Sequence, residues 1–387
     1  MSAGRRLWLL AAVPCLAAVG ACSSGSNLPP AQPLPPNPQK VQVHRDWSHD
    51  VGGGGGRQLL GLSPDARDGL VVAASAGGNV VAVDATSGRV KWRHHLGARL
   101  SGGPAVGDGL VAVGTRSGKV IALDAKTGKP KWRQYVGAPV NTAPAISNSV
   151  VVVKTIAGDV TGLTPADGKE LWTRNESVPS LSLRFDTRPL IVDGTAYAGF
   201  ADGKAMAIDV STGKAKWRQQ VATGQGGNLV ADMVDVGGSM AYAGGDLYVA
   251  TYQGKLAALD DSSGQTIWSR SVSSYTGVTL DGSHLYVSDA DGSVHAFDLV
   301  TGVPDWVYGK LGYRGLSAPV SDGSIVAVGD RFGYLHFLDR SNGAYLGRVS
   351  VGGGPIRMPP VVVDNRVVVL DLDGTLAAYR VSMRKSK

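Results

Sequence analysis

One short pattern recurs along the chain about every 40 residues, and it restricts the possible folds more than any other feature. In each copy a run of alternating apolar residues ends in Asp, a turn ends in Gly four residues later, and Trp follows after four more. The complete copies are Asp84/Gly88/Trp92, Asp124/Gly128/Trp132, Asp209/Gly213/Trp217, Asp260/Gly264/Trp268 and Asp298/Gly302/Trp306. A repeat of this period, made of strands and turns, is typical of propellers whose blades have four strands. The repeat therefore predicts an all-β propeller.

Incomplete copies of the pattern set the number of blades. One copy has Thr164 in place of Asp, a later one has Gly347 in place of Trp, and the last, at residues 374–380, ends after its strand. The strand that this last copy lacks is found at the other end of the chain, where the segment around Trp47 repeats the spacing of the segment around Trp92. We therefore expect eight antiparallel blades, with the N-terminal strand completing the last blade so that the ring has no long exposed edge.

The tryptophans that follow the N-terminal segment all occupy this one position of the repeat. They are Trp47, Trp92, Trp132, Trp172, Trp217, Trp268 and Trp306. A ligand site would use one or two aromatic residues, whereas one per blade indicates a structural role. We expect each ring to lie on an outer strand and to dock against the neighbouring blade.

Composition agrees with short strands and tight turns, because the chain has 54 Gly and 20 Pro and only 18% charged residues. The formal net charge is +7, and it falls to +5 without Arg5 and Arg6. This excess is mild and scattered, and no nucleic-acid-binding motif accompanies it, so we expect no nucleic-acid partner.

The N-terminus has the order of a secretory signal, with Arg5 and Arg6 followed by an apolar run at residues 7–18. The run ends in Val-Gly-Ala before Cys22, which resembles the lipobox of bacterial lipoproteins, where the signal is cut before the cysteine and the thiol is acylated. The run is too short for the ~20 residues of a membrane-spanning helix. By the same resemblance, Ser23 after the cysteine implies sorting to the outer membrane, with the protein facing the periplasm.

Three segments are therefore expected. Residues 1–21 are a lipoprotein signal peptide, residues 22–40 are a lipidated cysteine with a Pro-rich extended tether, and residues 41–387 are the propeller. Cys15 leaves with the signal and Cys22 carries lipid, which leaves no free thiol for disulfides, thiolate catalysis or metal binding.

The connections between blades differ in length on one face only. Trp92 and Trp132 are each 12 residues from the start of the next blade, whereas the distance is 17 residues after Trp172 and about 25 after Trp217. These two long loops are consecutive, so they leave adjacent blades on one face. Loops of this kind on a rigid scaffold are where a binding site is expected.

The first loop, residues 177–189, contains Leu181, Leu183 and Arg184, a mixture of apolar and guanidinium groups favoured in protein interfaces. The alternative is that the leucines pack into the blade and the arginine pairs with Asp186. The second loop, residues 228–240, contains two carboxylates that form an acidic counterpart to the first loop. They are Asp232 and Asp235. No His or third carboxylate lies near them in the sequence, which argues against a metal or acid–base site.

Taken together, the quinoprotein-type repeat, the lipobox, the Pro-rich tether and the Leu181-Ser-Leu-Arg184 loop resemble the BamB family, lipoproteins of the outer-membrane β-barrel assembly machinery. The resemblance covers the chain from Cys22 to Arg380. It implies a non-enzymatic scaffold without cofactor that binds the POTRA domains of the BamA-type barrel subunit, works with the other lipoproteins of the complex, and helps to deliver unfolded outer-membrane proteins.

In that family the leucine-arginine loop and an Asp-Val-Asp loop form the partner site, which corresponds here to Leu181, Leu183, Arg184 and Asp235. The second loop departs from the family pattern. Gly237 stands where the second aspartate is expected, and Asp232 stands where a basic residue is usual. The role of this loop is therefore less well supported than that of the first.

Two other classes of function share the fold. A quinone-dependent alcohol dehydrogenase has the same blade motif, but it needs calcium ligands, a catalytic aspartate and often adjacent cysteines, and no such cluster is evident here. Stoichiometric binding of quinone and calcium would favour it. A propeller that binds or senses another periplasmic ligand would be favoured if barrel-assembly components never co-purified with the protein.

Overall fold

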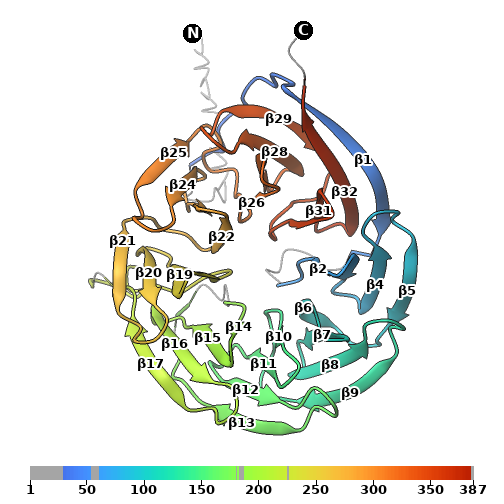
Figure 1. Ribbon diagram of the computed structural model, residues 1–387, viewed down its shortest axis with the longest axis vertical. Coiled ribbons are helices and arrows are strands. Elements are labelled where there is room, and N and C mark those ends of the chain that lie inside the picture. Colours follow the sequence, from blue (N-terminus) through green and yellow to red (C-terminus); the bar gives the residue numbers. More distant parts are fainter. Residues whose placement is uncertain (1–28, 54–60, 180, 183–186, 225, 385–387) are drawn as a thin grey trace, which may run out of the picture. The chain divides into compact units, whose positions relative to one another are not determined.

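Eight four-stranded antiparallel sheets surround a central axis as the blades of a propeller (Figure 1). The computed structural model describes residues 29–53, 61–179, 181–182, 187–224 and 226–384. Residues from Ala31 onward form one compact unit, and this unit contains every described strand. In the described part, no helix is long and apolar enough to cross a bilayer. The predicted all-β fold with eight blades is confirmed.

The first four blades follow the chain in order, each with its strands running from the axis to the rim. Their strands are β2 (Asp65–Arg67), β3 (Leu70–Ala74), β4 (Asn79–Asp84) and β5 (Val90–His95) in blade 1; β6 (Leu100–Gly107), β7 (Leu110–Thr115), β8 (Lys119–Asp124) and β9 (Pro130–Tyr135) in blade 2; β10 (Ala145–Ile146), β11 (Val151–Lys154), β12 (Val160–Leu163) and β13 (Glu170–Arg174) in blade 3; and β14 (Leu190–Val192), β15 (Thr195–Gly199), β16 (Lys204–Asp209) and β17 (Ala215–Gln220) in blade 4.

The next three blades repeat this order, and the eighth combines the two ends of the chain. The strands are β18 (Ala241–Ala243), β19 (Asp246–Ala250), β20 (Leu256–Asp260) and β21 (Thr266–Arg270) in blade 5; β22 (Val278–Asp281), β23 (His284–Ser288), β24 (Val294–Asp298) and β25 (Pro304–Tyr308) in blade 6; β26 (Val320–Ser321), β27 (Ile325–Gly329), β28 (Tyr334–Asp339) and β29 (Tyr345–Ser350) in blade 7; and β30 (Val361–Val363), β31 (Arg366–Leu370), β32 (Thr375–Met383) and β1 (Val41–Asp50) in blade 8.

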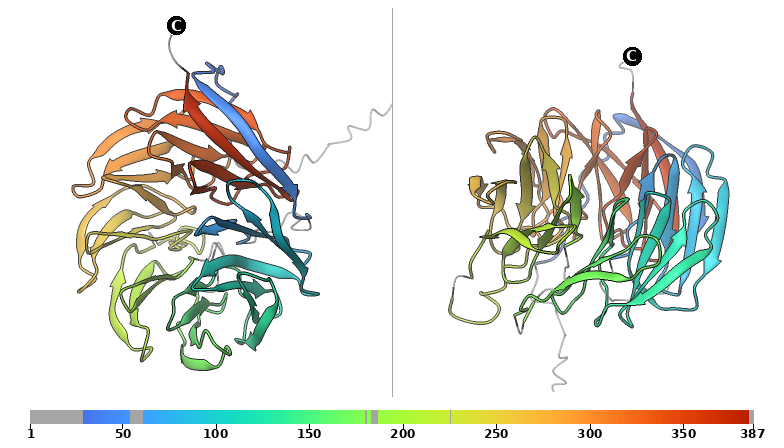
Figure 2. Two further views of the ribbon diagram at one scale, coloured as in Figure 1. Left: turned by 45° about the vertical axis from the view of Figure 1, so that its right-hand side comes forward. Right: turned by 60° about the horizontal axis from the view of Figure 1, so that its bottom comes forward.

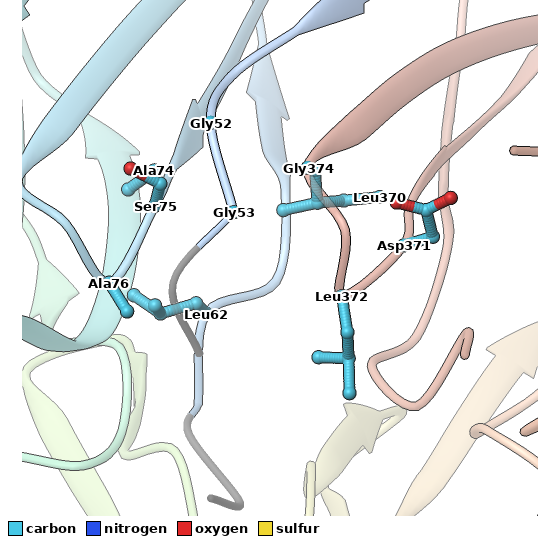
Figure 3. Close-up of a pocket in the computed structure, with 10 residues that line it drawn as sticks. All are labelled: Gly52, Gly53, Leu62, Ala74, Ser75, Ala76, Leu370, Asp371, Leu372 and Gly374. Carbon is cyan, nitrogen blue, oxygen red and sulfur yellow. The ribbon is translucent and has the colours of Figure 1, made fainter. Parts of the chain in front are cut away.

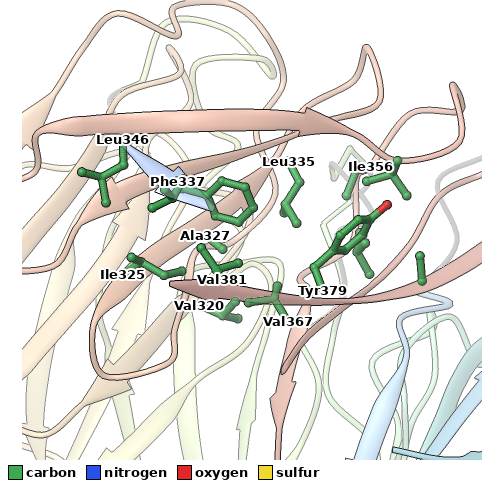
Figure 4. Close-up of a cluster of buried hydrophobic side chains, with 14 residues drawn as sticks. Val320, Ile325, Ala327, Leu335, Phe337, Leu346, Ile356, Val367, Tyr379 and Val381 are labelled. Carbon is green, nitrogen blue, oxygen red and sulfur yellow. The ribbon is translucent and has the colours of Figure 1, made fainter. Parts of the chain in front are cut away.

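The two middle strands of each blade are buried on both faces because neighbouring blades cover them. In blade 1, residues 71–74 and 80–83 are all buried, and they are valines and alanines. The outermost strand β5 instead faces solvent on one side, and Trp92 is its buried residue. Each hydrophobic cluster is consequently shared by two blades, as Figure 4 shows for Phe337 of blade 7 and Tyr379 of blade 8. Such clusters hold neighbouring blades to one another.

The turn between the two outer strands is held by its first residue. The carboxylate of Asp84 accepts hydrogen bonds from the backbone N–H and the hydroxyl of Ser87, at 2.9 and 2.8 Å. These bonds, together with one from Lys91, hold the pKa of Asp84 well below its usual range. The following Gly88 has φ +69°, a conformation that favours glycine. The repeated Asp and Gly of the sequence are therefore explained by the geometry of one turn.

Each tryptophan of the repeat joins its blade to the next one. The indole N–H of Trp92 donates to the backbone carbonyl of Ala125 in blade 2 at 2.8 Å, and the ring lies against Gly128. The seven equivalent bonds measure 2.6 to 3.2 Å, and each indole is 7 or 8% exposed. A Cβ on the facing glycine would lie 2.4 to 2.7 Å from the ring in all seven cases. The glycine is thus required by ring packing as well as by the turn.

The ends of the chain close the ring, as the sequence predicts. Strand β1 pairs antiparallel with β32, with Val41 opposite Met383 and Trp47 opposite Ala378. Figures 1 and 2 show the N-terminal strand in blue beside the C-terminal strand in red. Asp46 in β1 accepts hydrogen bonds from two arginines of the same blade at 2.8 Å; these are Arg366 and Arg380. These bonds, with that of Arg380 the largest, lower the pKa of Asp46 to about 2.

Part of the Pro-rich segment lies against the propeller. The stretch Gln32–Lys40, called the strap below, is held at both ends by backbone bonds, from Gln32 N–H to Gly312 at 2.9 Å and from Lys40 N–H to Leu346 at 2.8 Å. Between them, Arg314 donates to the carbonyl of Gln32 at 3.1 Å, and Arg348 donates to the carbonyl of Pro35 at 2.7 Å.

The strap also accounts for the tryptophan missing from blade 7. In blade 8 the outer strands are β32 and β1, the two ends of the chain, so no turn joins them and no facing glycine exists for a ring to dock on. A Cβ on Gly347 would meet Oδ1 of Asn37 at 3.1 Å and Val41 at 3.3 Å. Glycine at this position leaves room for the strap.

Candidate functional site

The two longest connections between blades are anchored firmly to the scaffold. The first loop is held near its start by an ion pair of 2.8 Å between Glu176 and Arg218 of β17. Near its end, Arg188 forms an ion pair of 2.9 Å with Asp65 of β2. The same carboxylate oxygen of Asp65 accepts the N–H of Val106 at 2.9 Å. Arg188 therefore connects the entry to blade 4 with the innermost strands of blades 1 and 2. Only the middle of the first loop is free of such anchors among the described residues.

The first and second loops are joined to each other. The hydroxyl of Thr187 donates to the carbonyl of Val236, and the N–H of Arg188 donates to the carbonyl of Gly238 at 3.3 Å. Arg188 also forms a parallel bridge with Ser239. The sequence predicts that the two loops leave adjacent blades on one face, and the described parts of both loops do lie in contact.

The second loop is joined in turn to the connection at residues 271–277. Ser239 accepts the N–H of Val278 at 2.9 Å and forms a parallel bridge with Gly277. Gly238 approaches this connection so closely that a Cβ would lie 2.1 Å from the backbone of Thr276. The described parts of residues 176–189, 222–240 and 271–277 therefore form one continuous surface, called the loop apron below.

The tip of the second loop presents apolar side chains to solvent. The side-chain carbonyl of Asn228 accepts the N–H groups of Val230 and Ala231 at 3.0 and 2.9 Å, which forms a tight turn. Asp232 accepts the N–H of Gly226 at 2.9 Å. With its polar groups used to hold the turn, the loop exposes 65% of Leu229 and 57% of Val230. In the right-hand view of Figure 2 this loop projects from the blades, in yellow-green.

The residues expected at the partner site lie in different environments. Leu181 is 40% exposed on the first loop. Leu183 and Arg184 lie outside the described residues. Asp235 was expected on the contact surface, but it is buried, with 2% of its surface exposed, and its backbone carbonyl accepts the N–H of Tyr252 at 2.9 Å. Its burial follows from the backbone contacts that draw this end of the second loop onto the neighbouring connection.

A buried charged cluster in blade 7 was not anticipated from the sequence. Asp330 accepts hydrogen bonds from Arg314 at 2.7 Å and His336 at 3.0 Å, and the carboxylate and the imidazole are fully buried. Burial disfavours the charged carboxylate, but the hydrogen bond from His336 and the others hold the pKa of Asp330 below its usual value. Burial lowers the pKa of His336.

The position of this cluster indicates a structural role. The other carboxylate oxygen of Asp330 accepts the N–H groups of Phe332 and Tyr334 at 2.9 and 3.0 Å, which closes the turn between β27 and β28. Blade 6 has a related pair, Asp289 and His295, at 2.7 Å. The shared six-residue spacing of Asp and His is the signal in the sequence that could have identified both pairs.

No cluster suited to a metal occurs in the part of the chain that the structure describes. It contains no group of three or more His, Cys, Asp or Glu side chains placed to hold an ion. A pocket lies where blades 1 and 8 meet (Figure 3). Its lining is mainly glycine and apolar residues: Gly52, Gly53, Leu62, Ala74, Ser75, Ala76, Leu370, Asp371, Leu372 and Gly374. Such a lining offers few polar groups to orient a cofactor.

Comparison with known proteins identifies close relatives. The family model described as outer membrane protein assembly factor BamB matches residues 44–308 and 311–384. The factor of this name from Pseudomonas aeruginosa is 48% identical over 377 residues, which cover 97% of this chain and 99% of the relative. The one from Escherichia coli is 32% identical, with 95% and 96% covered.

Solved structures give the same result at the level of the fold. The crystal structure of BamB from Moraxella catarrhalis superposes with a TM-score of 0.79 at 30% identity, and the match covers 88% of this chain and all of that one. The quinohemoprotein alcohol dehydrogenase from Comamonas testosteroni has a TM-score of 0.69 at 16% identity, covering 90% of this chain and 78% of that one. At that identity the second likeness concerns the propeller alone.

Proposed function

Because this chain belongs to the family of the outer membrane protein assembly factor BamB, we propose that it is a non-enzymatic scaffold of the outer-membrane protein assembly complex. Its partners are the POTRA domains of the BamA-type barrel subunit and the other lipoproteins of the complex. Through these contacts it aids the delivery and insertion of unfolded β-barrel proteins.

The loop apron is the surface that supports this proposal most directly. It carries exposed apolar side chains, Leu181 at 40%, Leu229 at 65% and Val230 at 57%, on loops whose ends are fixed by ion pairs and backbone bonds. Apolar side chains held on a rigid base bind a protein partner with little loss of conformational entropy. On the first loop, we assign the direct contacts to Leu181, Leu183 and Arg184.

Asp235 has a different part in this proposal. Its side chain is buried at the base of the second loop, so it acts as a positioning residue that shapes the loop from within. The exposed tip at Leu229 and Val230 takes over the contact that the family pattern gives to the acidic loop. The glycine at position 237, where the family pattern has a second aspartate, agrees with this assignment. A Cβ at Gly237 would lie only 2.9 Å from the backbone of Tyr275.

The N-terminal segment indicates where in the cell the scaffold is located. We propose that residues 1–21 are removed, that Cys22 carries the lipid, and that the protein is anchored in the outer membrane facing the periplasm. The Arg-Arg start, the apolar run and the Val-Gly-Ala-Cys22 sequence support this assignment.

The test compares a double variant of the first loop with a matched control. Leu183→Ala/Arg184→Ala should abolish binding to purified POTRA domains in calorimetric titration and leave the melting temperature nearly unchanged. The control, Leu171→Ala/Arg89→Ala, removes an exposed leucine and an exposed arginine elsewhere and should bind normally. Normal binding by the loop variant would refute the assignment, and a large drop in its melting temperature would show that the loop is structural.

A further inference from the structure

The strap fixes the point at which the N-terminal chain leaves the propeller. Gln32 is bonded in both directions, through its N–H to Gly312 and through its carbonyl to the guanidinium of Arg314. Arg314 is itself held by Asp330 and is only 5% exposed, so it provides a rigid attachment. The chain outside the strap therefore ends at residue 31, beside the connection between blades 6 and 7.

Little chain remains between this point and the proposed lipid. Cys22 and Ala31 are nine residues apart, which is a reach of at most about 28 Å at the rise of an extended polyproline segment. Without the strap, the reach from Cys22 to the first strand would be about twice as long. A short connection keeps the attachment point close to the membrane and raises the effective concentration of the membrane surface there.

An aromatic and cationic surface lies at the attachment point. Phe332, at the tip of the turn between β27 and β28, is 45% exposed. Two guanidinium groups stack on its ring, that of Arg314 at 4.5 Å and that of Arg331 at 5.0 Å from the centroid. Arg314 is paired with Asp330, whereas Arg331 takes part in none of the ion pairs found among the described residues. Arg331 and Phe332 are called the exit patch below.

The fold itself does not require an exposed phenylalanine at this turn. The equivalent turn occurs in every blade, and the residue before its last glycine is small or polar in the other seven. These residues are Gly77, Ser117, Ala157, Asp202, Gln253, Asp291 and Asp373. Phe332 is the single aromatic at this position among the eight equivalent turns, and it lies next to the end of the strap, which points to a role outside the propeller.

We propose that the exit patch rests on the anionic phospholipid surface of the membrane that holds the anchor. This inference relies on the proposed acylation of Cys22. Aromatic side chains are favoured at the boundary between headgroups and acyl chains, and unpaired arginines are attracted by anionic headgroups. The acyl chain and the exit patch then act as two attachments, and the propeller has a defined orientation toward the membrane rather than a free one.

The test uses residues 22–387 with Cys22→Ser, so that neither the signal segment nor acylation contributes to binding. We expect this protein to co-sediment with vesicles of phosphatidylcholine and phosphatidylglycerol, to lose this binding as salt is raised, and to bind vesicles of phosphatidylcholine alone poorly. Arg331→Ser/Phe332→Ser should lower the partition onto anionic vesicles roughly fivefold or more, since one cation near such a surface accounts for about that factor. Melting temperatures show whether the variants are folded.

The matched control is Arg89→Ser/Val300→Ser, which removes an exposed arginine and an exposed valine from turns between the outer strands, and it should bind as the parent does. Equal loss in both double variants, or no binding by the parent, would overturn the proposal. Binding of an acidic peptide at the exit patch without vesicle binding would also overturn it, and would assign the patch to a protein partner. POTRA binding is measured on the same variants and should be unaffected, so failure of the scaffold proposal can be told apart from failure of this one.

Discussion

Substituting Gly128 tests whether ring packing, rather than turn geometry alone, requires glycine at the repeat position. A Cβ at residue 128 would lie 2.5 Å from the ring of Trp92, and the backbone has φ +72°. Gly109, in the inner turn of the same blade, has φ +75° and no atom within 4 Å of the equivalent position. Alanine at either position incurs the same backbone cost, and only Gly128→Ala adds a steric clash with the indole.

The magnitudes follow from these two terms. The left-handed conformation costs a non-glycine residue roughly 1–2 kcal/mol, which is expected for Gly109→Ala. Overpacking against a fixed ring adds about 1–3 kcal/mol, so Gly128→Ala should be less stable than Gly109→Ala by that amount. Trp92→Ala alone should cost about 3–5 kcal/mol, because the ring is 8% exposed. In the Trp92→Ala background the extra cost of Gly128→Ala should disappear.

Urea unfolding of the four variants and the parent, followed by far-ultraviolet circular dichroism, measures these differences. The comparison requires that the slopes of the transitions agree. Equal destabilisation by Gly109→Ala and Gly128→Ala would refute the packing argument. So would an unchanged effect of Gly128→Ala once the Trp92 ring has been removed, because the double-mutant cycle isolates that contact.

Three further predictions concern the closing blade, the strap and the loop apron. Because the pKa of Asp46 is about 2 in the fold and 3.8 for a free aspartate, its bonds to Arg366 and Arg380 stabilise the protein above pH 3.8. The difference in unfolding free energy between the parent and Asp46→Asn should shrink as the pH falls from 3.8 toward 2. A difference that does not change with pH would contradict this prediction. Gly347→Trp should displace the strap, so that trypsin cleaves after Lys40 faster than in the parent; an unchanged cleavage rate would count against the steric explanation. Thr187→Val should accelerate amide exchange in residues 228–240 and cost about 1 kcal/mol, and unaltered exchange there would show that this hydroxyl does not hold the two loops together.

The sequence predicts the parts of the fold that depend on a single local geometry. Asp84, Gly88 and Trp92 recur because one turn and one ring contact recur, and this repetition is enough to count the blades and to place Trp47 beside β32. The positions of the two long loops follow in the same way, since loop length is read directly from the spacing of the tryptophans.

Features that depend on contacts between distant segments could not be predicted. The Pro-rich composition indicates an extended chain, but nothing near residues 32–35 reveals that Arg314 and Arg348 bind their carbonyls. Asp235 has the residue type of a surface loop, yet the close approach of Gly238 to Thr276 draws the neighbouring chain inward. The exposure of Leu229 and Val230 could not be predicted, because the Asn228 turn that presents them has no counterpart in the repeat.

Site-specific photocrosslinking in cells tests most directly whether the loop apron is the partner surface. A photoreactive residue would replace Leu181 or Leu229 on the apron, and Val300, which is 73% exposed on a turn between outer strands, would serve as the control position. The account predicts adducts with the POTRA region of the barrel subunit from both apron positions and none from Val300. Adducts from Val300 alone, or equal yields from all three positions, would contradict it.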